Sequence, residues 1–123
     1  MILRALVKSW LRPGKHLLPW FVASFAVLFV SWAALLVFVL PRYRELEFMR
    51  LHYTAQYGVD WVGPWQSAFT FPLLGLALIL ANLYLVAVLD QRFRGLAVLV
   101  AEATLLFEIV IAAAVGLAIF LNL

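Results

Sequence analysis

Two glutamates, Glu102 and Glu108, lie inside a long apolar segment near the end of the chain. A carboxyl group in hydrocarbon can bind a proton, hold a cation, or donate a hydrogen bond once it is protonated. At about 100° per residue, the six steps between them separate the two side chains by about 120° around a helix. The two glutamates therefore cannot both contact the same neighbouring helix.

Glu108 falls on a narrow face of mostly small residues, which is the kind of face along which membrane helices approach closely. The other members of this face are Ala97, Ala101, Thr104, Ala112 and Val115. Glu102 points away, alongside Leu105, Ile109 and Ala113. We therefore expect Glu108 to be buried between helices and protonated at neutral pH. Glu102 is expected to contact another subunit or to reach toward the membrane surface.

The elements that hold these glutamates are membrane spans. Of the 123 residues, 67% are hydrophobic and 12% are charged, which is typical of an integral membrane protein. We predict an all-α fold with three transmembrane helices in one membrane domain, residues 1–123. Its parts are a segment 1–16, a first span 17–40, a loop 41–65, a second span 66–89, a loop 90–94 and a third span 95–122.

The segment 1–16 is amphipathic, with Arg4 and Lys8 on one side of a short helix and apolar residues on the other. It predicts a helix on the cytoplasmic membrane surface, with a simple extension of the first span as the alternative. The first span is longer than the apolar part of a cleaved signal peptide, so we expect an uncleaved anchor.

The distribution of basic residues predicts the orientation. Six lie before the first span and in the second loop, and three lie in the first loop. Positive residues favour the cytoplasmic side, so we expect the N-terminus in the cytoplasm and the C-terminus outside, in a bacterial inner (plasma) membrane. The net charge of +3 is too small and too dispersed to indicate nucleic-acid binding.

Polar residues in the spans fall into two layers. Asn82 and Ser24 lie at about the depth of Glu102, while Ser31 lies at about the depth of Glu108. Hydrogen bonds from the glutamates to these groups would hold the helices together, each contributing about 1 kcal/mol. The alternative is a proton or cation site at Glu108.

The first loop is rich in aromatic residues, which usually mark the level of the lipid headgroups. The residues of interest in this interfacial loop are His52, Tyr53, Asp60, Trp61 and Trp65. A sharper hypothesis is a cap in which His52 and Asp60 bind a ligand or partner. Two such ligands are too few for a metal site, so we expect none.

The stretch LHYTAQYGVDWVGPW, followed by FTFPLLGLALILANLYL, resembles a family of small uncharacterised bacterial three-span membrane proteins. The resemblance covers roughly residues 50–90 and rests on His52, Tyr53, Gly58, Asp60, Gly63, Pro64 and Trp65. It implies one central polar residue in the third span, so the second glutamate departs from the family pattern. It implies no activity.

Catalytic and cofactor-binding patterns are missing from the sequence. There is no cysteine, no phosphate-binding loop and no nucleophile elbow, and the two histidines fall on opposite sides of the membrane. Arg92, Arg94 and Glu108 resemble the loop and acid of a rotor-ring c subunit, but the dense glycine repeat is absent. The small size and the intramembrane glutamate also resemble those of small multidrug exporters. Those proteins have four spans with the acid in the first span, and this pattern is absent here.

We therefore expect a small accessory or structural subunit that is no enzyme and needs no cofactor. Its partners would be the lipid bilayer and either other membrane subunits or further copies of itself. The alternative is a small oligomeric proton-coupled transporter or channel that uses Glu108.

Overall fold

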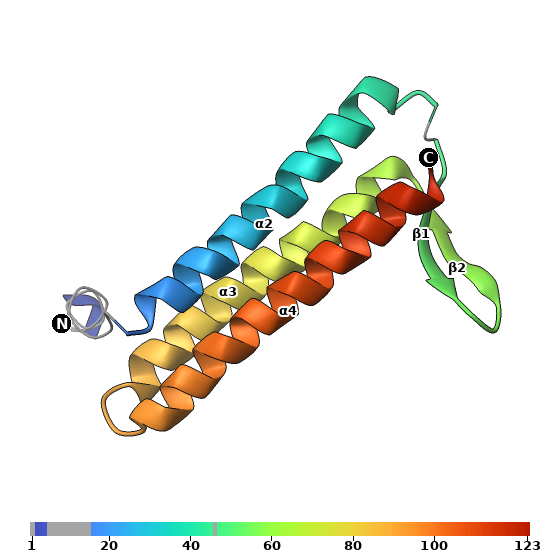
Figure 1. Cartoon of the computed structure of the whole chain (residues 1–123). Helices are drawn as coiled ribbons and strands as arrows, with labels where there is room; N and C mark the ends of the chain where they lie inside the picture. The colour runs from blue at the N-terminus through green and yellow to red at the C-terminus, as the bar shows by residue number, and fades with distance from the viewer. Residues whose placement is uncertain (1, 5–15, 46) are drawn as a thin grey trace.

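The computed structural model describes residues 2–4, 16–45 and 47–123. Three long helices run up, down and up: α2 (Leu18–Val39), α3 (Thr70–Leu89) and α4 (Arg94–Leu121) (Figure 1). Each is long and apolar enough to cross a membrane, which agrees with the three predicted spans. Residues 2–4 are helical, but most of the predicted amphipathic segment 1–16 lies outside the described residues.

Short 3-10 helices lie at the loop ends of the first two spans. Helix η1 (Leu40–Arg42) follows α2 and contains Pro41, and η2 (Trp65–Phe69) follows Pro64 and leads into α3. Proline has no backbone N–H to donate, so it favours helix ends over helix interiors. The second loop is a tight connection between α3 and α4, as its few residues require.

The first loop contains a β-hairpin, so the prediction of an all-α fold is wrong in this part of the chain. Strands β1 (Met49–Thr54) and β2 (Gly58–Gly63) pair antiparallel. Gly58 closes the turn with φ of 72°, a left-handed conformation that glycine adopts without steric strain. Tyr and Trp favour strands as well as contacts with lipid headgroups, so the aromatic content of the loop alone did not distinguish a hairpin from an interfacial loop.

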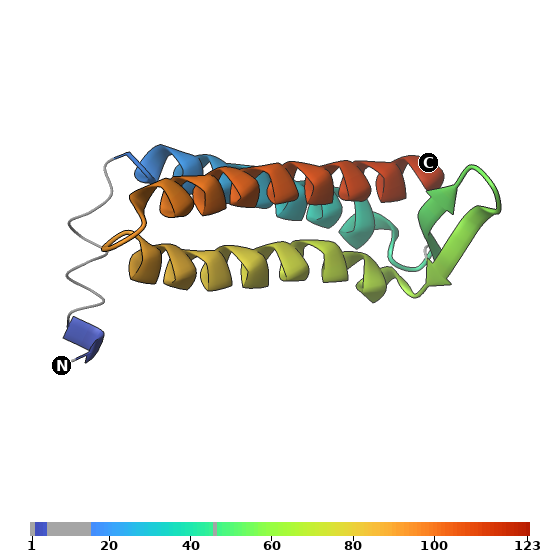
Figure 2. The same ribbon diagram turned by 90° about the horizontal axis from the view of Figure 1, so that it is seen from below.

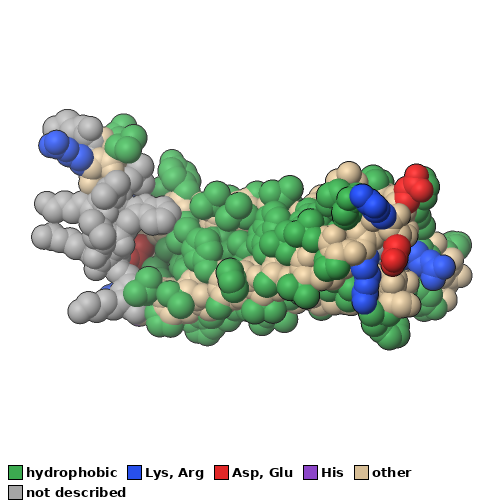
Figure 3. All heavy atoms as spheres, turned by 90° about the horizontal axis from the view of Figure 1, so that it is seen from above, with side chains coloured by type: hydrophobic (Ala, Val, Ile, Leu, Met, Phe, Trp, Pro, Cys, Tyr) green, Lys and Arg blue, Asp and Glu red, His purple; other side chains and the backbone are tan. Residues whose placement is uncertain are grey.

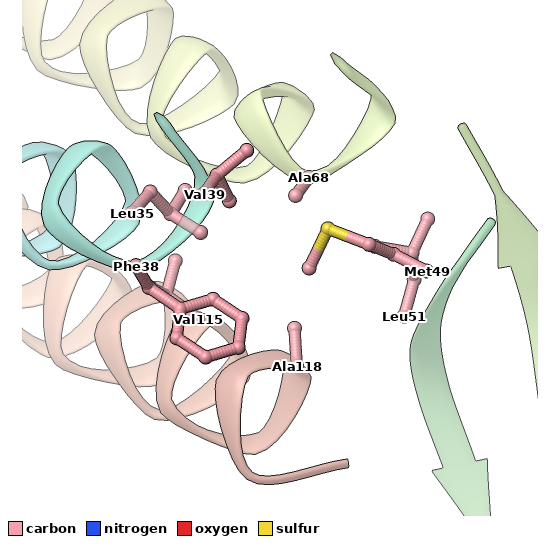
Figure 4. Close-up of a cluster of buried hydrophobic side chains, with 8 residues drawn as sticks. All are labelled: Leu35, Phe38, Val39, Met49, Leu51, Ala68, Val115 and Ala118. Carbon is pink, nitrogen blue, oxygen red and sulfur yellow. The ribbon is translucent and has the colours of Figure 1, made fainter. Parts of the chain in front are cut away.

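The hairpin packs against the ends of the helices through one face. Along β1 the side chains alternate, and Met49 and Leu51 are fully buried. They join one apolar cluster with residues of α2, η2 and α4 (Figure 4): Leu35, Phe38, Val39, Ala68, Val115 and Ala118. The hairpin is therefore a packed cap and not a loose surface loop.

Asn122 fastens this cap to the end of α4. Its side-chain oxygen accepts from the backbone N–H of Arg50 at 2.9 Å, and its amide nitrogen donates to the carbonyl of Arg50 at 2.7 Å. The same amide donates to the carbonyl of Ala118. Asn122 thus pairs with β1 as a further strand residue would, and it also satisfies a carbonyl left open at the helix end.

Helix α4 is the centre of the bundle. It packs along both α2 and α3, which contact each other much less, and Figure 2 shows α3 as a separate row below the other two. A second apolar cluster fills the end opposite the hairpin, from Leu17 and Phe21 to Ala97 and Ala101. Figure 3 shows apolar side chains along the helices and charged ones at the two ends, most of them at the hairpin end.

Candidate functional site

Glu108 lies in the middle of the bundle, on α4, with only 1% of its surface exposed. It faces Gly75 of α3, where an added Cβ would lie 2.7 Å from Oε2 of Glu108 and 3.2 Å from Oε1. The same Cβ would lie 3.2 Å from Cδ1 of Leu28 on α2. All three helices therefore meet at this carboxyl group.

The buried face of α4 is close to the predicted one. Its buried residues are Ala97, Ala101, Thr104, Glu108, Ile111, Val115 and Ala118. Ala112, expected on this face, is half-buried, and Ile111 is buried instead. Small residues on α4 and the glycine on α3 let the two backbones approach, and the approach encloses the glutamate.

Neither carboxyl oxygen of Glu108 has a hydrogen-bond partner among the residues that the structure describes. The predicted bonds from Glu108 to serine or asparagine are therefore wrong. Ser31 donates to the carbonyl of Val27, and Ser24 donates to the carbonyl of Trp20, each within α2. Both serines are buried, but their hydroxyls satisfy their own helix, which is the usual choice of serine in a span.

Asn82 provides a polar link between helices, but its partner is Thr104 and not a glutamate. Its amide donates to Oγ1 of Thr104 at 2.8 Å, and Thr104 donates in turn to the carbonyl of Val100 at 2.7 Å. Gly75 and Asn82 share the face of α3 that meets α4, as their spacing of seven indicates. Thr104 lies one helical turn from Glu108 on the same face of small residues. That position indicates that Thr104 faces another helix, as its bond with Asn82 requires.

Glu102 lies on the outer surface of the bundle, as its angle to Glu108 predicts. Its neighbours on that surface of α4 are large and apolar: Leu99 is 59% exposed, Leu106 63% and Ile109 50%. The structure separates the two glutamates into a sealed group and an outward-facing one. They form no joint site.

The loop residues lie in the hairpin and beside it. His52 and Trp61 are paired across the strands, with His52 and Tyr53 exposed, and the ring of Trp61 lies 5.7 Å from that of Phe71. Asp60 lies in β2, and its side chain is outside the described part. Among the described residues, no group of three or more His, Cys, Asp or Glu could hold a metal ion.

Trp65 lies at the foot of the hairpin, within a group of aromatic rings. Its ring is 6.3 Å from Tyr43 and 6.2 Å from Phe69, in edge-on arrangements that aromatic pairs favour. This packing holds the end of α2 against the start of α3.

A cluster of polar side chains lies at the end of the bundle opposite the hairpin, and no sequence pattern predicts it. Nε2 of His16 lies 3.7 Å from the Asp90 carboxylate, and Nε of Arg94 donates to Nε2 of His16 at 3.3 Å. These residues connect the start of α2 to the loop between α3 and α4. Residues so distant in the sequence can be paired only once the packing of the helices is known.

Comparisons of the chain with protein-family models, with curated proteins and with solved structures find no match.

Proposed function

We propose that the chain is a small accessory or structural subunit of an oligomer or larger complex in the inner (plasma) membrane. In this role α4 packs against α2 and α3 through its buried face and offers its outer surface, with Glu102, to a partner. The proposed orientation has the N-terminus in the cytoplasm and the C-terminus outside, on the basis of the basic residues.

The outward direction of Glu102 is the observation that supports this role. Its carboxyl group is surrounded by exposed leucine and isoleucine side chains within a span. An acidic group facing lipid is unfavourable, by up to about 3 kcal/mol at the centre of a bilayer. A partner helix that offers a hydroxyl, amide or basic group at that depth would remove this penalty. Most of the surface of each span is also free for contacts outside the chain.

Co-purification under mild detergent tests the proposal. Wild-type protein should retain a stable partner or self-assemble, and Glu102→Leu should release it while leaving the fold intact. Leu99→Ala and Ile109→Ala, on the same outward surface, are matched controls that alter packing without touching the charge. A Glu102→Leu variant that retains every partner and is more stable would show that Glu102 faces lipid alone, contrary to the proposal.

A second candidate function is proton binding at Glu108, as part of a transporter or channel. The supporting observation is a carboxyl group that is 1% exposed with both oxygens unpaired among the described residues. An acid kept at such a place without a structural hydrogen bond is more typical of a functional group than of a packing one. Proton flux into liposomes that depends on Glu108, and is absent in Glu108→Gln, would support this function over the first.

A further inference from the structure

A recess of about 340 Å³ opens at the hairpin end of the bundle. Its lining residues are Tyr43, Arg44, Glu47, Pro64, Trp65 and Gln66. The first span ends beside it at Arg42 and the second begins at Trp65. The recess therefore lies where the apolar helices give way to polar chain, which is the level of the lipid headgroups. It is separate from both glutamates of the spans.

The recess carries one positive and one negative side chain that do not pair with each other. The guanidinium of Arg44 lies 5.7 Å from the ring centroid of Tyr43, and its Nε donates to the Tyr43 hydroxyl at 3.1 Å. Within the described part of the chain, neither Arg44 nor Glu47 forms an ion pair. A guanidinium has five N–H donors, so four remain available to an anion.

The aromatic side of the recess is held in place before any ligand binds. Trp65 packs edge-on against Tyr43 and Phe69, and it is half-buried where the chain enters η2. The hydroxyl of Tyr43 accepts from the guanidinium of Arg44, and both side chains are exposed. Rings that already pack against one another need less ordering when a ligand enters.

We propose that this recess binds the headgroup of a phospholipid that carries both a phosphate and a primary ammonium, as phosphatidylethanolamine does. The free N–H groups of Arg44 bind the phosphate oxygens, for which the planar guanidinium is well shaped. The carboxylate of Glu47 accepts hydrogen bonds from the ammonium, which has three donors. The rings of Tyr43 and Trp65 contact the glycerol and the first acyl carbons.

Native mass spectrometry of delipidated protein tests the proposal. The protein is mixed with phosphatidylethanolamine, phosphatidylglycerol or phosphatidylcholine of identical acyl chains, and bound lipid is counted. We expect wild-type protein to retain phosphatidylethanolamine best. Arg44→Gln and Glu47→Gln should each lower that retention by about tenfold, because each removes a hydrogen bond to a charged group.

The same segment offers matched controls. Arg42→Gln and Glu45→Gln remove the same charges a few residues away, from side chains that do not line the recess. Arg42 stacks on Phe38 at 4.9 Å instead. Both controls should retain lipid like the wild type. Equal losses in the controls and in the recess variants would overturn the proposal, since a general charge effect would then account for the binding.

The lipid series separates the roles of the two charges. Glu47→Gln should weaken phosphatidylethanolamine and spare phosphatidylglycerol, which has no ammonium, whereas Arg44→Gln should weaken both. Wild-type protein that retains phosphatidylglycerol or phosphatidylcholine as well as phosphatidylethanolamine would contradict the proposal. Soluble phosphoethanolamine, which lacks acyl chains, should be retained far less than the lipid. Equal retention would assign the recess to a soluble ligand and overturn the lipid assignment.

Discussion

Gly75 and Glu108 fit together across α3 and α4, because the glutamate side chain occupies the space that a side chain at position 75 would need. A Cβ there would lie 2.7 Å from Oε2 of Glu108, closer than real Cβ contacts occur. The glycine on one helix and the acid on the other therefore form one packing unit. The two helices therefore come close together at the middle of the bundle.

Gly75→Ala should lower the free energy of unfolding by about 1–3 kcal/mol, because the added methyl group meets the end of the Glu108 side chain, which is buried between the helices and has little room to move. In a Glu108→Ala background the same change should be milder, with a coupling of about 0.5–3 kcal/mol between the two positions. Thermal unfolding in detergent gives all four stabilities. Gly116→Ala is the control, because a Cβ at that exposed glycine of α4 would meet nothing within 4 Å. Equal effects at both glycines would contradict the proposed fit.

The bond between Asn82 and Thr104 makes a second stability prediction. Thr104→Val keeps the shape of the side chain but leaves the Asn82 amide without its acceptor, so we expect a loss of about 1 kcal/mol. Ser31→Ala should have a much smaller effect, because that hydroxyl bonds only to its own helix at Val27. Both can be measured by the same unfolding assay. If Ser31→Ala destabilises the protein as much as Thr104→Val, the bond between helices does not contribute more than a bond within one helix, contrary to this prediction.

The contrast between these residues shows which parts of the site can be predicted from the sequence. Helical spacing placed Glu108 on the buried face and Glu102 on the outer one, because the angle between them depends only on the helix period. The spacing of seven between Gly75 and Asn82 likewise puts both on one face of α3. Spacing does not give the relative shift of two helices along their axes, so Asn82 was matched in depth with Glu102 and in fact bonds to Thr104.

The hairpin and its contacts were harder to predict for a different reason. Tyrosine and tryptophan favour strands and also gather at lipid headgroups, so the first loop supported two interpretations. The bond from Asn122 to Arg50, and the group around His16 and Asp90, join residues more than seventy positions apart. Such contacts depend on tertiary packing, and no local pattern records them.

The link between Asn122 and Arg50 predicts how the hairpin detaches. Asn122→Leu removes both bonds to β1, and we expect faster hydrogen exchange at the Arg50 amide, by about fivefold or more if the net loss is about 1 kcal/mol. Asn122→Asp keeps an acceptor for that amide and loses the donor, so its effect should be intermediate. The exchange rate of amides within α3 serves as the internal control. Unchanged exchange at Arg50 in Asn122→Leu would mean that Met49 and Leu51 alone hold the hairpin.

The proposed orientation predicts where single cysteines react. Gln91 is exposed in the loop between α3 and α4, and Gln56 is exposed at the tip of the hairpin, at the opposite end of the helices (Figure 1). The chain has no cysteine of its own, so each introduced thiol can be labelled alone. A membrane-impermeant maleimide should reach Gln56→Cys from outside and Gln91→Cys only from the cytoplasmic side. The reverse pattern would invert the orientation, and labelling of both from one side would contradict three spans.

Replacement of Glu108 separates packing from chemistry. Glu108→Gln keeps the size of the side chain and its ability to donate a hydrogen bond, so the fold should be preserved. Glu108→Leu exchanges an unpaired polar group for an apolar one of similar size against Gly75 and Leu28. Because no hydrogen bond to a described residue is lost, we expect this variant to be stabilised by about 1 kcal/mol or more.

A structural hydrogen bond at Glu108 would give the opposite sign, with Glu108→Leu less stable than the wild type. Unfolding in detergent therefore distinguishes an unpaired Glu108 from a hydrogen-bonded one. The control is Leu106→Ala, which changes a side chain on the outer surface of α4 and leaves the buried acid in place. If Glu108→Leu is more stable and proton flux or another activity is lost, the carboxyl group is retained for its chemistry. If both Glu108 variants keep partner assembly and show no loss of any activity, proton transfer at Glu108 is ruled out, and the subunit role is the one that stands.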